Sequence, residues 1–221
     1  MDHEFWLDKW QRNEIGFHLD EVNSSLVVAW PQLGVESGRI LVPLCGKSID
    51  MLWLLHQGLD VVGIELSPLA LEALRTTIAD HLGWEFIRTE RDGVVVYEHD
   101  RVLLIEGDLF AVKPETCGEI TAVYDRAAMV ALPAAMRDRY REQILALSKS
   151  APQLLITLDY DQSVAGGPPF AVSDAEVRKA LERHFTIRCQ DERELIDQEP
   201  RFKAKGLTSF VQRTYLLTPL A

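Results

Sequence analysis

The stretch Gly46-Lys47-Ser48 raises the first question of chemistry, because it follows one apolar run and precedes an amphipathic one. These three residue types in this order are typical of a loop that binds nucleotide phosphates. Such a loop needs a second glycine five residues earlier, so that successive backbone amides can turn toward the phosphates. Leu41 stands at that position, and Pro43 has no amide hydrogen to contribute. The sequence therefore argues against a nucleoside-triphosphate site.

Two acidic residues point to another nucleotide-like ligand. Glu65 ends the run "VVGIE", 19 residues after Gly46, where a carboxylate can accept hydrogen bonds from both hydroxyls of an unphosphorylated ribose. Asp108 follows Gly107 at the end of the next apolar run, where it can accept a hydrogen bond from the exocyclic amine of a base. The alternative, that Glu65 only begins the next loop, stays open from spacing alone. Adenosine carrying a cation, as in S-adenosylmethionine, suits these acids and a chain of net charge −11.

Arg126 and two tryptophans could act on the methyl acceptor and on the cofactor. Arg126 follows an apolar run, and its planar guanidinium could hold a heterocycle nitrogen or an anion; it could equally pair with Asp125 or Glu65. Trp6 and Trp10 are four residues apart and share one helix face, with Phe17 nearby. This stripe is either part of the core or an aromatic lid that contacts a sulfonium through cation–π attraction.

An alternation of apolar runs and amphipathic segments predicts the elements that must position these residues. The pattern is typical of a mostly parallel α/β sheet with helices on both faces. Helices are expected between the runs, for example after Ser67-Pro68 and after Ser173. The expected parallel strands are Arg39–Pro43, Asp60–Glu65, Arg101–Glu106, Ile120–Asp125 and Gln153–Asp159.

Two parts of the chain depart from this alternation. Residues 84–100 contain a turn at Asp92-Gly93 between alternating segments and predict an inserted hairpin. Two late strands, near Thr186–Gln190 and Thr208–Thr218, are expected to pair antiparallel at the sheet edge. Residues 1–34 are expected to form a helical lid before a Rossmann-like core at 39–221, both within a single domain 1–221.

Composition narrows the class of protein further. The net charge argues against nucleic-acid binding, and no apolar run is long enough for a membrane span. Three cysteines without a close pair fit a reducing compartment and give no metal signature. A charged N-terminus lacks the apolar run of a signal peptide, so a cytoplasmic protein is expected. We also expect a monomer that acts on small molecules.

Several motifs resemble the thiopurine S-methyltransferase family in its bacterial form. They are "FWLDKW", "GFH", "PLCGKSIDMLWL", "GIELS", "YDRAAMVAL", "GPPF" and "YLLT", and they run from Phe5 to Thr218. The resemblance implies a class I S-adenosylmethionine-dependent methyltransferase. Its sheet would have seven mostly parallel strands with the final strand antiparallel, and N-terminal helices would cover the site.

The resemblance also implies roles for individual residues. The positions that it places at S-adenosylmethionine are Trp10, Leu44, Gly46, Glu65, Gly107, Asp108 and Arg126. The positions that it places at the methyl acceptor are Phe17, Arg126 and Arg201. It implies no metal. The implied reaction is methyl transfer to aromatic or heterocyclic thiols such as thiopurines, and bacterial members are also associated with the detoxification of selenium and tellurium compounds.

Two other functions stay open at this level. Asp125, Asp159 and Asp161 could gather a magnesium ion in a metal-dependent O-methyltransferase. A protein that binds S-adenosylmethionine without catalysis would carry the same cofactor motifs. His18 could assist a proton transfer or make only a structural hydrogen bond. Cys45 is expected to be a small buried filler without a catalytic role.

Overall fold

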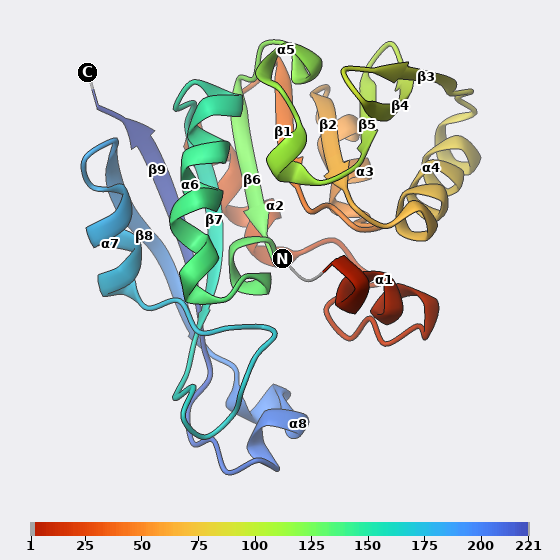
Figure 1. Ribbon diagram of the computed structural model, residues 1–221. Helices are drawn as coiled ribbons and strands as arrows, with labels where there is room; N and C mark the ends of the chain where they lie inside the picture. Colours follow the sequence, from red (N-terminus) through yellow and green to blue (C-terminus); the bar gives the residue numbers. More distant parts are fainter. Residues whose placement is uncertain (1–2, 221) are drawn as a thin grey trace.

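A nine-stranded mixed sheet organises the computed structural model, which describes residues 3–220. The strand order is β3-β4-β5-β2-β1-β6-β7-β9-β8 (Figure 1). The strands are β1 (Arg39–Pro43), β2 (Asp60–Glu65), β3 (Ile87–Arg91), β4 (Val94–His99), β5 (Val102–Glu106), β6 (Ala122–Arg126), β7 (Gln153–Asp159), β8 (Phe185–Glu194) and β9 (Val211–Pro219). Strands β5, β2, β1, β6 and β7 run parallel, whereas β9 is antiparallel to both of its neighbours.

The expected fold class is confirmed, and the sheet is wider than expected. Strands β5-β2-β1-β6-β7-β9-β8 are the seven that the resemblance implied, with the final strand antiparallel between β7 and β8. The expected hairpin is β3–β4, with positive φ angles at Asp92 and Gly93. It adds two strands because β4 pairs antiparallel with β5, and its Val94 and Val96 are buried. The hairpin is therefore part of the sheet.

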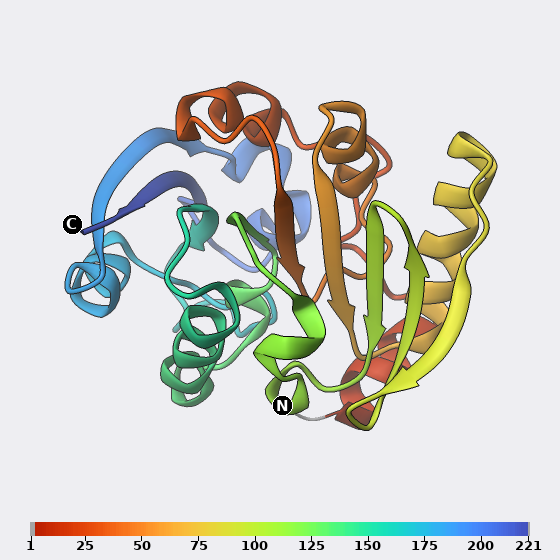
Figure 2. The ribbon, with the colours of Figure 1, turned by 90° about the horizontal axis from the view of Figure 1, so that it is seen from above.

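Helices cover both faces of this sheet (Figure 2). Helices α2, α3 and α4 bury their apolar residues in the cluster on one face, and α5, α6 and α7 do so on the other. The helices are α1 (His3–Gln11), α2 (Ser24–Ala29), α3 (Asp50–His56), α4 (Pro68–Leu82), α5 (Pro114–Cys117), α6 (Ala134–Ser148), α7 (Asp174–Leu181) and α8 (Pro200–Lys203), with short 3-10 turns η1 (Trp30–Leu33), η2 (Leu109–Ala111), η3 (Met129–Ala131) and η4 (Ile196–Gln198).

The helix ends follow from local sequence. Ser67 caps α4 by accepting a hydrogen bond from the Ala70 amide, and Gly83 ends that helix in the left-handed region. Ser173 caps α7 in the same way. Pro133 is the N-cap of α6, so it begins the helix and does not kink it. Among residues 3–220, no helix combines the length and apolar character that a membrane span requires.

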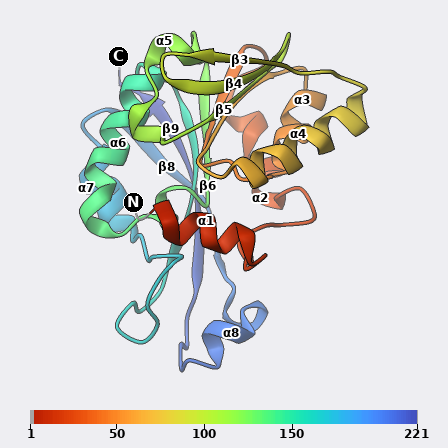
Figure 3. The ribbon, with the colours of Figure 1, turned by 45° about the vertical axis from the view of Figure 1, so that its right-hand side comes forward.

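The N-terminal segment divides into two parts with different roles in the fold. Helix α1 has no buried residue and lies at the end of the sheet toward which β2 and β6 run (Figures 1 and 3). Leu26 and Ala29 of α2 and Trp30 of η1 are buried in the core against the sheet. Within the expected lid 1–34, only α1 and its following loop thus lie outside the core, and α2 with η1 packs into it.

A small second cluster extends the structure beyond the sheet. Tyr160, Phe202 and Phe210 pack together, with ring centroids 4.5–5.5 Å apart. The cluster joins the loop after β7 to α8 and to the start of β9, below the sheet in Figure 1. It projects from the same end of the molecule as α1.

Candidate active site

The loop after β1 is held in a fixed conformation by its neighbours. Leu44 and Gly46 both have positive φ angles, 47° and 54°. The Cys45 amide donates to Ile64 O at 3.0 Å, and the Gly46 amide donates to Oε2 of Glu65 at 2.8 Å. A Cβ on Gly46 would lie 2.9 Å from Cζ2 of Trp10. Both the positive φ angle and the nearby indole therefore require glycine at this position. Because the Gly46 amide is bound to Glu65, it is not available to a phosphate, and the phosphate-loop interpretation stays rejected.

Glu65 connects the ends of the first two parallel strands. It is the last residue of β2, is 6% exposed, and accepts from the amides of Gly46 and Ser67, each at 2.8 Å. Burial raises the pKa of Glu65, and hydrogen bonds from Ser67 and Gly46 counteract part of that rise. A carboxylate offers about four lone-pair positions, so Glu65 can still accept from a further donor such as a hydroxyl group. Glu65 therefore does more than begin the next loop.

Asp108 occupies the corresponding place after β5. Its Oδ1 accepts from the Phe110 amide at 3.0 Å, and Nε2 of His3 lies 3.3 Å from its Oδ2. The preceding Gly107 donates its amide to Glu65 O at 2.9 Å. Glu65 and Asp108 thus lie at adjacent strand ends, and α1 reaches the second of them through His3.

The aromatic residues near the N-terminus form a half-buried layer over the loop. Phe17 packs edge-on against both Trp6 and Trp10, with centroids 5.7 and 5.5 Å away. Both tryptophans keep some exposure to solvent, so the stripe is not part of the buried core. Because Trp10 also contacts Gly46, this layer covers the loop between β1 and α3.

Arg126 ends β6 beside a fully engaged carboxylate. Asp125 accepts from the Met129 amide at 3.2 Å and from the Tyr140 hydroxyl at 2.7 Å, and burial raises its pKa to about 6. Within residues 3–220, Arg126 takes part in none of the ion pairs. The alternative of a pair with Asp125 or Glu65 is therefore wrong.

Arg201 reaches the N-terminal loop from a distant part of the chain. It lies in α8, with its guanidinium 5.0 Å from the Phe202 ring centroid. A Cβ on Gly16 would lie 3.9 Å from Nη1 of Arg201. The structure thus brings Arg201 next to the segment that carries Phe17.

Lys47 and His18 belong to the same region, although the sequence interpretation assigned Lys47 no role after the phosphate loop was rejected. Burial, then Lys47, and more weakly Arg126, lower the pKa of His18, whereas Asp20 and Asp50 act in the opposite direction. These groups are therefore electrostatic neighbours. The position of Lys47 directly after Gly46 was the only sequence signal for it.

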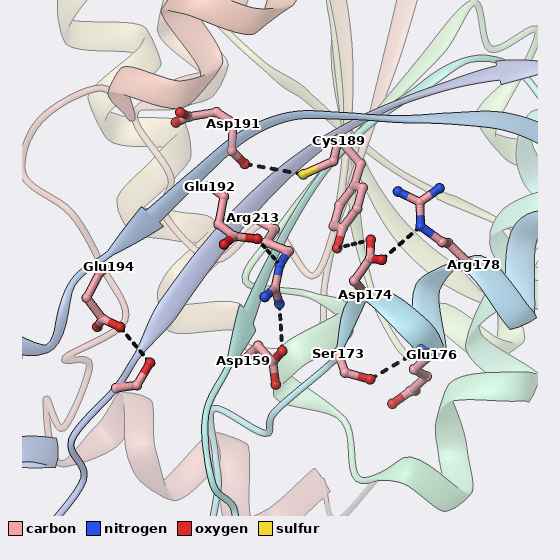
Figure 4. A network of polar contacts seen from close by, with 12 residues as sticks. Asp159, Ser173, Asp174, Glu176, Arg178, Cys189, Asp191, Glu192, Glu194 and Arg213 are labelled. Atoms are coloured by element: carbon pink, nitrogen blue, oxygen red, sulfur yellow. Dashed lines mark hydrogen bonds and ion pairs between the residues drawn. The ribbon is translucent and has the colours of Figure 1, made fainter.

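The three aspartates of the metal-dependent alternative have separate partners. Asp125 faces Met129 and Tyr140, as described above. Asp159 accepts from Nη1 of Arg213 at 2.6 Å (Figure 4), and Asp161 accepts from the Ser163 hydroxyl at 2.6 Å. In the described part of the chain, no three histidine, cysteine or acidic side chains are placed to hold a metal ion. That alternative therefore lacks its ligand set.

The strand order and the acids at the ends of β2 and β5 define a class I S-adenosylmethionine-dependent methyltransferase. Solved structures agree on the fold. The chain is similar to Burkholderia thailandensis 1,6-didemethyltoxoflavin-N1-methyltransferase, solved with S-adenosylhomocysteine, at TM-score 0.64 and 16% identity over 98% of this chain and 87% of that one. It is also similar to a TehB-like methyltransferase from Corynebacterium glutamicum, at TM-score 0.57 and 12% identity over 99% and 98%.

The chain belongs to the thiopurine S-methyltransferase family. The model of that family matches residues 1–219. A thiopurine S-methyltransferase of Pseudomonas fluorescens is 42% identical over 99% of this chain and 97% of that relative. One of Xanthomonas campestris pv. campestris is 44% identical over 98% of this chain and 99% of that relative.

The side chains at this edge fit the cofactor of the class. Glu65 and Asp108 are acceptors, as the hydroxyls and the amine of adenosine require. The Gly46 amide is already bound to Glu65, which suits a cofactor without phosphates. The half-buried faces of Trp6 and Trp10 suit a sulfonium.

Proposed function

We propose that this protein transfers the methyl group of S-adenosylmethionine to the sulfur of aromatic and heterocyclic thiols, thiopurines among them. The observation that carries the proposal is the position of Arg126. This residue stands unpaired within residues 3–220, at the strand end where substrates meet cofactors in such sheets, beside an edge lined by Glu65 and Asp108. Curated relatives that share over 40% of their residues with this chain carry the name thiopurine S-methyltransferase.

The cofactor would be held by residues of three strand ends and the lid. Glu65 would accept from the ribose hydroxyls, and Gly107 with Asp108 would bind the adenine. Leu44, Gly46 and Trp10 would face the part that carries the sulfonium, next to Arg126. When bound, the cofactor supplies a methyl group on a positively charged sulfur, which is a strong electrophile.

The chain's own residues would orient the acceptor and exclude water. A thiopurine sulfur is substantially anionic near neutral pH, so positioning contributes more than proton removal for that acceptor. Arg126 and Arg201 would hold the heterocycle or its charge, and Phe17 would cover it. Orientation of the two reactants can contribute about 7 kcal/mol or more to such a displacement. An anionic acceptor needs these local arginines, because the chain as a whole is acidic.

Selenium and tellurium compounds are proposed as further acceptors, and the protein is proposed to act as a cytoplasmic monomer. The test is a methyl-transfer assay across thiopurines, thiophenols, selenite and tellurite, run with and without a chelator. Transfer to thiols that the chelator does not affect supports the proposal. Tight binding of S-adenosylhomocysteine without turnover on any acceptor would favour the non-catalytic alternative. Calorimetry showing tight ATP binding and none for S-adenosylhomocysteine would reject the cofactor site itself.

A further inference from the structure

His18 and Lys47 are two titratable side chains at this edge that the proposed function does not use. His18 follows Phe17 in the loop after α1, and only 13% of its side chain is exposed. Lys47 follows Gly46 and remains half-buried. Trp10 joins the two segments, because its indole contacts Gly46 and packs edge-on against Phe17.

The charges that act on His18 come from four segments of the fold. Lys47 after β1 and Arg126 at the end of β6 act as like charges, whereas Asp50 at the start of α3 and Asp20 in the loop of His18 itself act as opposite charges. Together with burial, the two cations hold the pKa of His18 below its ordinary value. A lowered pKa favours the neutral ring, which can accept a proton.

The two aspartates differ in their availability. Asp50 is buried, and its oxygens accept from the Tyr124 hydroxyl and the Asn23 amide, each at 2.8 Å. Asp20 is fully exposed, with Oδ1 3.6 Å from Nε2 of His18. Asp50 is thus committed to the scaffold, whereas Asp20 marks the side from which His18 can exchange protons with solvent.

The two cations are free to act on a ligand. Like Arg126, Lys47 takes part in none of the ion pairs among the residues that the structure describes. A neutral imidazole beside two unpaired cations is a suitable arrangement for ionising a weak acid. The ring takes the proton, and the cations stabilise the anion that remains.

We propose that His18 removes the proton from acceptors that arrive as neutral thiols, and that Lys47 and Arg126 hold the resulting thiolate. The inference rests on the proposed S-methyltransferase function and extends its acceptors to thiols that are not ionised at neutral pH. The S–H bond breaks, its electron pair stays on sulfur, and the proton forms a bond to a ring nitrogen of His18. The imidazolium then releases the proton to solvent on the side of Asp20.

The methyl transfer that follows is balanced in charge. The sulfur pair forms the bond to the methyl carbon, and the bond from that carbon to the cofactor sulfur breaks with its pair staying on the departing sulfur. A thiolate and a sulfonium become two neutral thioethers. Thiopurines, which ionise in part near neutral pH, depend mainly on the cations, whereas alkyl and benzyl thiols also need His18.

The test compares two acceptors in the full-length protein. Benzyl mercaptan is neutral near pH 7, and 4-nitrothiophenol is a thiolate at that pH. In His18→Gln, kcat/KM for benzyl mercaptan should fall about 100-fold, as for loss of a general base, and that for 4-nitrothiophenol by less than about threefold. His56→Gln, an exposed histidine at the C-terminal end of α3, should change neither. An equal loss with both acceptors in His18→Gln would overturn the proposal.

Two measurements on other preparations keep the result interpretable. In wild type, kcat/KM for benzyl mercaptan should rise through a pKa below 6.5 and then stay level, and it should not track the thiol's own ionisation. Benzyl mercaptan bound with S-adenosylhomocysteine, where no methyl group can transfer, should show the ultraviolet absorbance of a thiolate in wild type and less of it in His18→Gln. Equal absorbance in the two proteins would refute the role of His18 alone. Wild type that methylates no thiol would refute the proposed function, and the inference with it.

Discussion

Glu65→Gln tests the assignment of the cofactor edge, and its effect can be worked from two hydrogen bonds. The wild-type carboxylate accepts from the amides of Gly46 and Ser67, each at 2.8 Å. Glutamine has one acceptor oxygen and one NH2 group, so one of these amides would face a donor. Leaving a buried N–H without its acceptor costs about 1–3 kcal/mol of the free energy of unfolding. Removing a buried charge offsets part of that cost, because burial raises the pKa of Glu65.

The same substitution should have a larger and more specific effect on cofactor binding. Glutamine would lose one charged acceptor for the ribose hydroxyls, which is worth about 1–3 kcal/mol. The dissociation constant for S-adenosylhomocysteine should therefore rise about 5- to 150-fold. Isothermal titration calorimetry on folded protein measures it, with thermal unfolding recorded in parallel.

A matched substitution on the same protein separates the two roles of Glu65. Glu72→Gln removes an exposed carboxylate of α4 that pairs with Arg75, and it should leave the dissociation constant unchanged. If Glu65→Gln lowers the melting temperature but binds S-adenosylhomocysteine as wild type does, Glu65 only holds the loop at Gly46, and the ribose assignment is wrong.

Three further predictions concern the acceptor, the lid and the pH dependence of stability. Arg126→Lys should lower kcat/KM for flat heterocyclic thiols, and Arg126→Ala should lower it more, while S-adenosylhomocysteine still binds. Lost cofactor binding, measured by calorimetry, would instead place Arg126 in the cofactor site or scaffold. Trp10→Leu should lower the affinity for S-adenosylmethionine about 2- to 30-fold more than that for S-adenosylhomocysteine, because only the former has a sulfonium for a cation–π contact of about 0.5–2 kcal/mol. If calorimetry shows the same loss of affinity for both ligands, Trp10 contributes packing alone. The pKa of Asp125 is raised from 3.8 to about 6, so the stability it contributes when protonated is lost as pH rises through that value. Denaturant unfolding should show wild type losing about 2 kcal/mol relative to Asp125→Asn between pH 4 and pH 7, because part of the unfolded chain is already ionised at pH 4. Parallel curves would contradict the shift.

Much of the scaffold could be predicted because its signals are local. The expected bounds of β1, β2 and β7 agree with the structure, since each is a short apolar run between turns. The cap at Ser67 and the turn at Asp92-Gly93 depend only on neighbouring residues. The last strands were expected as an antiparallel edge pair, and the structure confirms this pairing.

The features that sequence did not reveal depend on contacts between distant segments. Strand β8 extends to Glu194 across a bulge, because the long β9 gives it a partner along that length. Arg201 approaches Gly16 only after α8 packs into the second cluster, which contains Tyr160 and Phe210. Lys47 has no local signal that distinguishes a ligand-facing lysine from a solvated one. Such positions follow from tertiary packing, which periodicity and capping patterns do not encode.

Helix α1 and its following loop contact both the residues proposed for the cofactor and a residue proposed for the acceptor. One segment could therefore cover both ligands. His3 reaches Asp108 on the side of the acids, and Trp10 rests on Gly46, whose amide Glu65 holds. On the other side, Gly16 adjoins Arg201. Carboxylates thus gather where a cation is expected to bind.

Two cations of the same edge act on the segment that follows α1. Lys47 and Arg126 are the like charges that act on His18, in the loop that follows α1. In the proposed reaction, an acidic chain would in this way offer the acceptor positive groups close to the carboxylates proposed for the cofactor. A thiolate and a sulfonium would then meet beneath α1 and its following loop, which would cover both reactants with a single segment.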